Sequence, residues 1–205
     1  MQIFNGSIFD FNSRIKDHTY ILGMEILDNM PHDRLYLDKS GEIGLCSQVT
    51  VTKHKEKESF QEQKIPITDD LIKQFISIYT SQDQNNVSFT QRLRTEGIIK
   101  RLYDTLRLTP RDEQQSIFAP TGALQLFNQL HLLIPNQTIV LADFDSFLTK
   151  QRGNLRGVNS PVVTHKLADP TKWKEFDTYL VQKGEADICF PTDFHLLRHA
   201  YSTVT

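Results

Sequence analysis

The chain has 205 residues, of which 39% are apolar and 23% charged, so it can bury one substantial core and is not disordered. Its 23 Lys and Arg residues against 25 Asp and Glu residues give a net charge of -2, which offers no general attraction for nucleic acid or an anionic membrane. No apolar run approaches the roughly 20 residues of a membrane-spanning helix. Cys46 and Cys189 lie too far apart in sequence for a zinc ribbon or a disulfide framework, which suits a reducing compartment.

The amino-terminal third of the chain predicts strands. Residues 19–24 form a short apolar run rich in β-formers, and carboxylates follow it at once. Residues 32–38 and 42–52 flank a Lys-Ser-Gly turn, which predicts a hairpin. The mixed charge run that follows alternates in sign, and we predict a solvated loop over residues 53–64.

Capping residues, apolar periodicity and proline stops predict four helices in the rest of the chain. Their ranges are 68–79, 90–106, 120–134 and 192–201. Short apolar runs predict strands over 138–142, 161–164 and 186–190. Helices that alternate with short, almost continuous apolar strands favour a single α/β domain over residues 1–205. Its sheet is predicted to be covered on both faces rather than antiparallel and one-sided.

Acidic side chains collect at the ends of two predicted strands. Glu25 and Asp28 follow residues 19–24, and Asp143 and Asp145 follow residues 138–142. Ligands of α/β folds bind at the carboxyl ends of strands. We therefore expect these acids to line a shared crevice, and they are the first candidates for a functional site.

Other chemistries have weaker support. Asp143-Phe-Asp145 after an apolar strand resembles the first motif of haloacid-dehalogenase-type phosphotransferases, which hold magnesium, but Phe147 departs from that motif and a turn-capping role stays open. His195 and His199 have metal-ligand spacing, yet the glutamate of a zincin is missing, and we predict no metal site. Neither a GxSxG elbow nor a Gly-rich nucleotide loop between a strand and a helix occurs.

Five blocks of sequence, taken together and in order, indicate one protein family. They are Tyr20–Arg34, Pro120–Leu124, Val140–Asp145, Gly157–Pro161 and Gly184–Phe194. The first is similar to a strand followed by an Asn-Glu-Leu-Leu-Asp-Ala-Leu-Pro motif. Together the blocks resemble the MidA-like family of S-adenosylmethionine-dependent methyltransferases, most closely its fungal mitochondrial branch related to the complex I assembly methyltransferase, over about residues 7–199.

The resemblance implies a Rossmann-like methyltransferase fold with S-adenosylmethionine as cofactor. It also implies an arginine acceptor in a protein substrate, such as a respiratory complex I subunit, and a mitochondrial location. Glu25 and Asp28 would then be catalytic, holding and polarising a guanidinium nitrogen through bidentate hydrogen bonds. Asp10 would contact the adenine end of the cofactor. Structural alternatives stay open, namely capping of the turn that Pro31 completes for the first two acids and a turn or helix cap for Asp10.

Two departures from the family pattern shape the expectations. Met24 stands where other branches carry a polar residue. The family's first strand, its Gly-rich cofactor loop and the acid that binds the ribose would precede residue 1, and no targeting segment is recognisable at the start of the chain. We therefore expect a domain incomplete at its N-terminus and weak or inactive alone. The alternative hypothesis is a non-enzymatic assembly or binding module.

Overall fold

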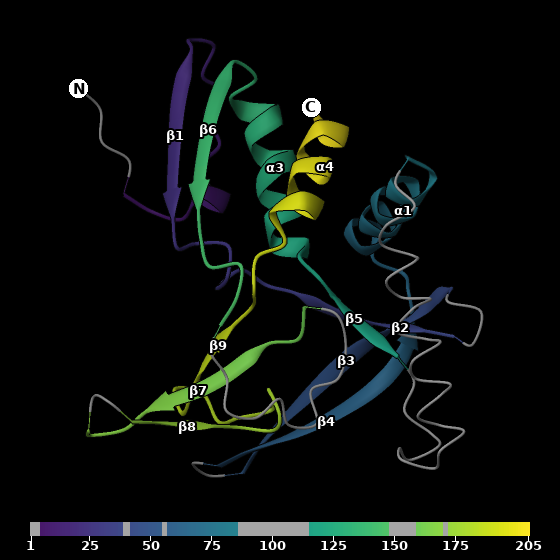
Figure 1. Cartoon of the computed structure of the whole chain (residues 1–205), viewed down its shortest axis with the longest axis vertical. Helices are drawn as coiled ribbons and strands as arrows, with labels where there is room; N and C mark the ends of the chain where they lie inside the picture. Colours follow the sequence, from purple (N-terminus) through teal and green to yellow (C-terminus); the bar gives the residue numbers. More distant parts are fainter. Residues whose placement is uncertain (1–4, 39–41, 55–56, 86–114, 148–158, 170–171) are drawn as a thin grey trace.

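A computed structural model describes residues 5–38, 42–54, 57–85, 115–147, 159–169 and 172–205 (Figure 1). A short 3-10 helix, η1 (Ile8–Asp10), opens the described part. The strands are β1 (Thr19–Met24), β2 (Asp33–Leu37), β3 (Ile43–His54), β4 (Lys57–Pro66), β5 (Ser116–Ala119), β6 (Gln137–Ala142), β7 (Val162–Lys166), β8 (Trp173–Glu175) and β9 (Asp187–Cys189). The α-helices are α1 (Asp70–Asn85), α3 (Thr121–Leu133) and α4 (Phe194–Val204).

The mixed α/β class is confirmed, but the strands form three sheets instead of the single doubly covered sheet that was predicted. β1 and β6 form a two-stranded parallel sheet, while β4-β3-β2-β5 and β8-β7-β9 form two antiparallel sheets. The reason is that an apolar run reports burial and not strand direction. β5, for example, is buried at all four positions and still pairs antiparallel with β2.

The small parallel sheet rests on α3 through one of its faces. Its register runs from Thr19 opposite Gln137 to Met24 opposite Ala142. Ile21 and Ile139 on this face pack against a cluster of buried side chains, Leu126, Leu130 and Ile134, that belong to α3 and the residue after it. α3 therefore sets the position of both strand ends, and Figure 1 shows the pair beside this helix.

Residues 53–64 are a clear correction to the predicted elements. The described part of this run lies in a long antiparallel hairpin, β3 with β4, and is not a loop. Lys53 lies opposite Glu58, and Lys53 Nζ forms an ion pair with Glu58 Oε1 at 3.1 Å. A charge pattern with a period of two fits a solvated strand as well as a loop, because successive strand side chains alternate between faces.

The predicted helices at 68–79, 120–134 and 192–201 correspond to α1, α3 and α4. Asp69 Oδ1 caps α1 by accepting the N–H of Leu71 at 2.8 Å, and Asp193 Oδ1 caps α4 by accepting the N–H of Leu196 at 2.9 Å. The predicted helix over 90–106 lies outside the described residues. None of the helices in the described ranges is long and apolar enough to cross a membrane.

The main core lies between the four-stranded sheet and the three α-helices. It includes Leu35, Leu37, Ile72, Phe75, Ile117, Leu124, Phe127, Leu196 and Leu197. Gly122 ties the turn after β1 to this core, because a Cβ at this position would lie 2.6 Å from Pro31 Cδ and 2.9 Å from Pro31 N. Its N–H donates to Pro31 O at 2.9 Å, so the segment that carries the candidate acids is held against the start of α3.

Candidate functional site

The parallel pairing of β1 with β6 brings the carboxyl ends of both strands, and the acids that follow them, to one edge of the small sheet. Glu25 N–H extends the ladder by donating to Ala142 O at 2.8 Å. One residue further, Asp143 Oδ2 accepts the N–H of Leu27 at 2.6 Å and the N–H of Asp28 at 3.2 Å. The structure therefore places Glu25, Asp28 and Asp143 in one cluster, while their chemical roles stay predictions.

Asp143 shapes this cluster by acting as a clamp on the backbone. Its Oδ2 holds the two amides of the turn after β1, and its Oδ1 accepts the N–H of Phe144 at 2.8 Å. A carboxylate with both oxygens engaged by backbone amides is poorly placed to attack phosphorus. In the described ranges, no group of three or more His, Cys, Asp or Glu side chains could hold a metal ion. The engagement of both Asp143 oxygens by backbone amides speaks against Asp143 as the nucleophile of a phosphotransferase.

Asp28 is the buried acid of the cluster, with 4% of its surface exposed. Asn29 Nδ2 donates to Asp28 Oδ1 at 2.6 Å. Burial raises the pKa of Asp28, with a further increase from the negative charges of Asp143 and Glu25, while the hydrogen bond from Asn29 works in the opposite direction. The result is a carboxylate that is more basic than an exposed one, which suits a group that has to accept a proton.

Glu25 is the exposed acid, and its backbone is unusual. Its φ is 53°, in the left-handed region that a residue with a Cβ adopts at a cost of about 1–2 kcal/mol. The hydrogen bond to Ala142 O on one side and the Asp143 clamp on the other hold the residue in this conformation. Strained residues of this kind are concentrated at functional sites, so the observation supports Glu25 as a candidate without assigning its role.

The end of β9 contacts the cluster through Cys189 and the residue after the strand, Phe190. Phe190 N–H donates to Asp28 O at 2.8 Å, and Cys189 Sγ lies 3.9 Å from Asn29 Oδ1, to which it donates. Burial, followed by the charges of Asp28 and Asp187, raises the pKa of Cys189 to about 11, so its thiol is not a nucleophile at neutral pH. Sequence reasoning missed both Asn29 and Cys189, and only the proximity of Asn29 to Asp28 in sequence could have indicated either.

His32 fills the space behind the cluster and is a packing residue. Its ring stacks on Phe190 with centroids 3.8 Å apart, and its Nδ1 lies 2.8 Å from Met30 O. Burial lowers the pKa of His32 to about 4, and the hydrogen bond with Met30 opposes this shift only partly. The imidazole is therefore neutral at physiological pH and supports the turn that Pro31 completes.

Asp10 and Asp145 lie outside these contacts. Asp10 is exposed at the end of η1, which packs on α3 through Ile8, and its contact with a cofactor stays a prediction. Asp145 is exposed, and its Oδ1 accepts the hydroxyl of Ser146 at 3.0 Å. The site that the structure builds therefore consists of Glu25, Asp28, Asn29 and Asp143.

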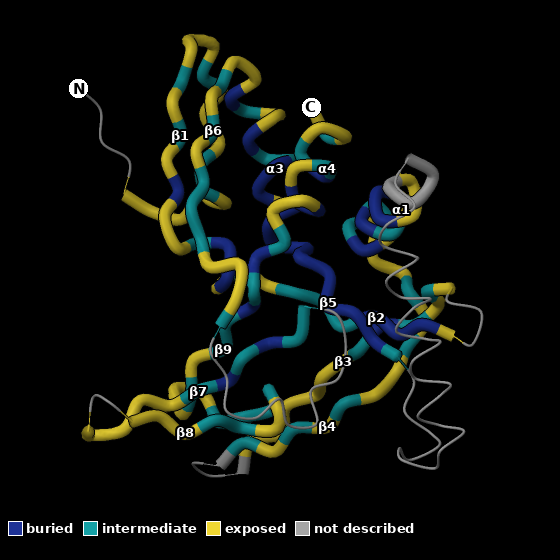
Figure 2. Tube along the Cα trace, in the orientation of Figure 1, coloured by how far each residue is buried: buried dark blue, intermediate teal, exposed yellow. Residues whose placement is uncertain are grey.

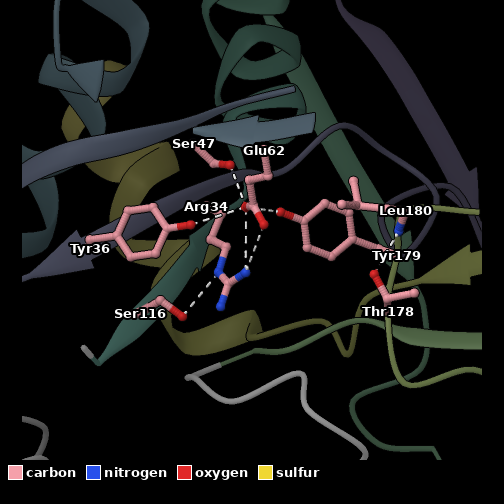
Figure 3. Close-up of polar contacts among 8 residues, drawn as sticks. All are labelled: Arg34, Tyr36, Ser47, Glu62, Ser116, Thr178, Tyr179 and Leu180. Carbon is pink, nitrogen blue, oxygen red and sulfur yellow. Dashed lines mark hydrogen bonds and ion pairs between the residues drawn. The ribbon is translucent and has the colours of Figure 1, made fainter. Parts of the chain in front are cut away.

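A second polar cluster, which we call the Glu62 cluster, lies on the four-stranded sheet and is structural (Figure 3). The Glu62 carboxylate accepts the hydroxyls of Tyr36, Ser47 and Tyr179 and faces Arg34 Nη1 at 3.4 Å. Burial and the hydrogen bond to Glu62 raise the pKa of Tyr179 to about 12, so this hydroxyl remains a donor. The Glu62 carboxylate is therefore held by side chains of the protein itself. Through Tyr179, the Glu62 cluster joins the segment after β8 to the β3–β4 hairpin.

Exposed carboxylates of this chain fit a cationic cofactor by their chemistry. Glu25 and Asp10 expose carboxylates, which are complementary to positively charged groups and to ribose or amine donors. S-adenosylmethionine carries a sulfonium and an ammonium group, and Asp10, the predicted cofactor contact, is the residue that would hold it.

Taken together, the features define an α/β protein with an acidic site at the ends of parallel strands. Comparison with protein families finds that residues 8–205 match the model of a family described as "Putative S-adenosyl-L-methionine-dependent methyltransferase". No curated protein and no solved structure matches the chain. The chain belongs to this family of MidA-like methyltransferases, and the family implies a transferase with S-adenosylmethionine as its cofactor.

Proposed function

We propose that the chain belongs to a protein arginine methyltransferase activity in which Glu25 and Asp28 hold the acceptor guanidinium. The observation that carries the proposal is the placement of an exposed and a buried carboxylate in one clamped turn at the end of β1. A guanidinium presents several N–H donors in a plane, and carboxylates bind such a group with directed, charge-assisted hydrogen bonds. The family resemblance adds a respiratory complex I subunit as substrate and the mitochondrion as location, and both belong to this proposal.

The proposed chemistry assigns a separate task to each acid. When bound, S-adenosylmethionine supplies an electrophilic methyl group on sulfur. Glu25 orients the guanidinium nitrogen for in-line attack, which is largely a matter of positioning. The methyl group would pass to the nitrogen with the loss of one proton from that nitrogen, and Asp28 would accept this proton. The raised pKa of Asp28 favours this last step.

The cofactor is tested first, by calorimetry with S-adenosylmethionine and the 205-residue chain. We expect binding weaker than submicromolar, because a Gly-rich cofactor loop does not occur in this sequence. Submicromolar binding without a second polypeptide would show that such a loop is not needed. Asp10→Asn tests the second cofactor contact, and an affinity equal to that of the unchanged chain would remove Asp10 from the site.

Glu25 is tested in a polypeptide that also contains a Gly-rich cofactor loop and that transfers methyl groups at a measurable rate. Glu25→Gln keeps the shape of the side chain and removes its charge, so we expect a loss in turnover of about 100-fold with little change in unfolding free energy. Glu42→Gln is the matched control, because Glu42 is also exposed and lies at the start of β3, away from the cluster. Equal losses of turnover and stability would assign Glu25 to a structural role.

A non-enzymatic assembly module is the second candidate, and one observation favours it. Tyr20, Leu22 and Met24 expose large apolar side chains on β1, as an interaction surface would. Recovery of a respiratory-complex subunit from a cofactor-depleted extract, without methyl transfer to that subunit, is the expected result for this alternative. Turnover that depends on Glu25 would reject it as the sole function.

A further inference from the structure

One face of the small parallel sheet is mainly apolar and is exposed in the part of the chain that the structure describes. On β1, the exposed fractions are 78% for Tyr20, 72% for Leu22 and 57% for Met24, and on β6 the exposed fraction is 53% for Val140. The register places Leu22 directly opposite Val140, so these side chains form one continuous surface, which we call the outer face. Figure 2 shows exposed residues recurring along both strands.

An uncovered face is unusual for parallel strands. The opposite side chains of the same strands, Ile21 and Ile139, are packed on α3, so the sheet is half covered. Parallel strands are normally buried on both faces, whereas antiparallel sheets tolerate a solvated face because that face is polar. The outer face is mainly apolar. At its amino end, His18 lies edge-on against Tyr20 with ring centroids 4.9 Å apart, and its Nε2 lies 3.2 Å from Thr138 Oγ1. Leu22, Met24 and Val140 remain more than half exposed among the described residues. Such a surface is typical of a binding site for another apolar surface.

The two ends of the outer face carry opposite charge. At the carboxyl ends of the strands, Glu25 and Asp145 are exposed, and residues 25–33 and 143–147 contain no Lys or Arg. At the amino ends, Arg14 and Lys16 are exposed and outnumber the single acid nearby, Asp17. A partner that lies along the strands therefore meets negative charge at one end and positive charge at the other.

We propose that the outer face binds an amphipathic helix of a partner protein that runs antiparallel to β1. From Tyr20 to Met24 the strand spans about 13 Å, which a helix of about nine residues matches. The positive N-terminal end of such a helix would lie at Glu25 and Asp145, and its negative C-terminal end would lie at Lys16. The apolar face of the helix would cover Leu22. The apolar contact with Leu22 does not depend on methyl transfer, although Glu25 also belongs to the proposed acceptor site.

The charges give the partner helix a recognisable sequence. Lys or Arg near its N-terminus and Asp or Glu near its C-terminus would complement the two ends of the outer face. Isolated helices prefer the reverse distribution, because acids stabilise the N-terminal end and bases the C-terminal end. Enrichment of the proposed pattern would therefore report the binding surface and not the intrinsic preference of the peptides.

The experiment is a selection of displayed helical peptides of 15 residues on the purified chain, with affinities of the selected peptides measured by fluorescence anisotropy. We expect apolar residues at helical spacing, bases near the N-terminus and acids near the C-terminus. Leu22→Glu and Tyr20→Ser should each weaken binding at least about 10-fold. The matched control is Leu132→Glu, because Leu132 is 64% exposed on α3 and lies off the outer face, and we expect a change of less than about twofold.

A charge exchange tests the orientation. Asp145→Lys should weaken the selected peptides and restore affinity for versions with Glu in place of the N-terminal bases. Selected peptides without the pattern, or equal effects of Leu22→Glu and Leu132→Glu, would overturn the proposal. A dimer that Leu22→Glu converts to a monomer in sedimentation experiments would also overturn it, because the occupant would then be a second copy. Circular dichroism confirms that each variant is folded before binding is measured.

Discussion

The clamp that Asp143 forms on the turn after β1 can be tested by removing its carboxylate. Asp143→Ala takes away the acceptor for the N–H groups of Leu27 and Asp28, whose residues are 3% and 4% exposed. A hydrogen bond to a charged group contributes about 1.5–3 kcal/mol, so the gross loss is about 3–6 kcal/mol. Relief of the repulsion between Asp143 and Asp28, together with water that enters the space, offsets part of it. We expect a net loss of about 2–4 kcal/mol in unfolding free energy.

The assay is urea unfolding followed by circular dichroism, and two further variants identify the cause. Asp143→Asn keeps an acceptor oxygen, so the unfolding free energy should fall less in this variant, by about 1 kcal/mol. Asp145→Ala is the matched control, because the only contact that we describe for its carboxylate is the hydroxyl of Ser146. We expect a change below about 0.5 kcal/mol for this variant. An Asp143→Ala variant as stable as the control would refute the clamp.

The same substitution has a second readout at Asp28. The negative charge of Asp143 contributes to the raised pKa of Asp28, so the pKa should fall in Asp143→Asn as the charge is removed. Carbon-detected NMR titration of the Asp28 carboxyl measures this shift directly. An unchanged pKa would mean that burial alone determines the basicity of Asp28, and the part of the reasoning that couples the two acids would be wrong.

Three further predictions concern the residues around the site. Glu25→Gly should stabilise the fold by about 1 kcal/mol in urea unfolding, since glycine adopts a positive φ without strain, and a loss would show that the side chain has structural contacts. Because the pKa of His32 is lowered to about 4, the unfolded state binds a proton before the folded state as the pH is lowered from about 6.5 to 4. The unfolding free energy, measured by urea unfolding at a series of pH values, should therefore fall by about 3 kcal/mol over this range, and His32→Phe should remove this dependence. Glu62→Gln should lower the unfolding free energy by about 1–3 kcal/mol, and Tyr179→Phe should lower it by less. If both variants were as stable as the unchanged chain, the structural role of the Glu62 cluster would be contradicted.

The sequence predicts the elements that depend on local patterns. The helices α1, α3 and α4 follow from caps such as Asp193 and from apolar periodicity, and β1 and β6 follow from short apolar runs. The strand β4 was mistaken for a loop because its charges alternate with a period that a loop also allows. The strands β5 and β8, of four and three residues, are not among the predicted elements.

The composition of the site was partly visible in the sequence, whereas its geometry was not. Acids after two apolar runs indicated Glu25, Asp28 and Asp143 as a group. The structure distinguishes these acids: Glu25 is exposed and strained, Asp28 is buried, and Asp143 clamps the backbone. This distinction depends on contacts between residues more than one hundred positions apart, such as the hydrogen bond from Leu27 to Asp143.

The sequence by itself determined the α/β class, the family resemblance and the acidic ends of two strands, because these depend on composition, on neighbouring residues and on the order of motifs. Only the tertiary structure decided how the described strands divide into three sheets and which face of β1 packs on α3. Strand pairing is set by hydrogen bonds and packing between distant segments. An apolar run such as residues 19–24 therefore carries the same pattern whether both of its faces are covered or only one.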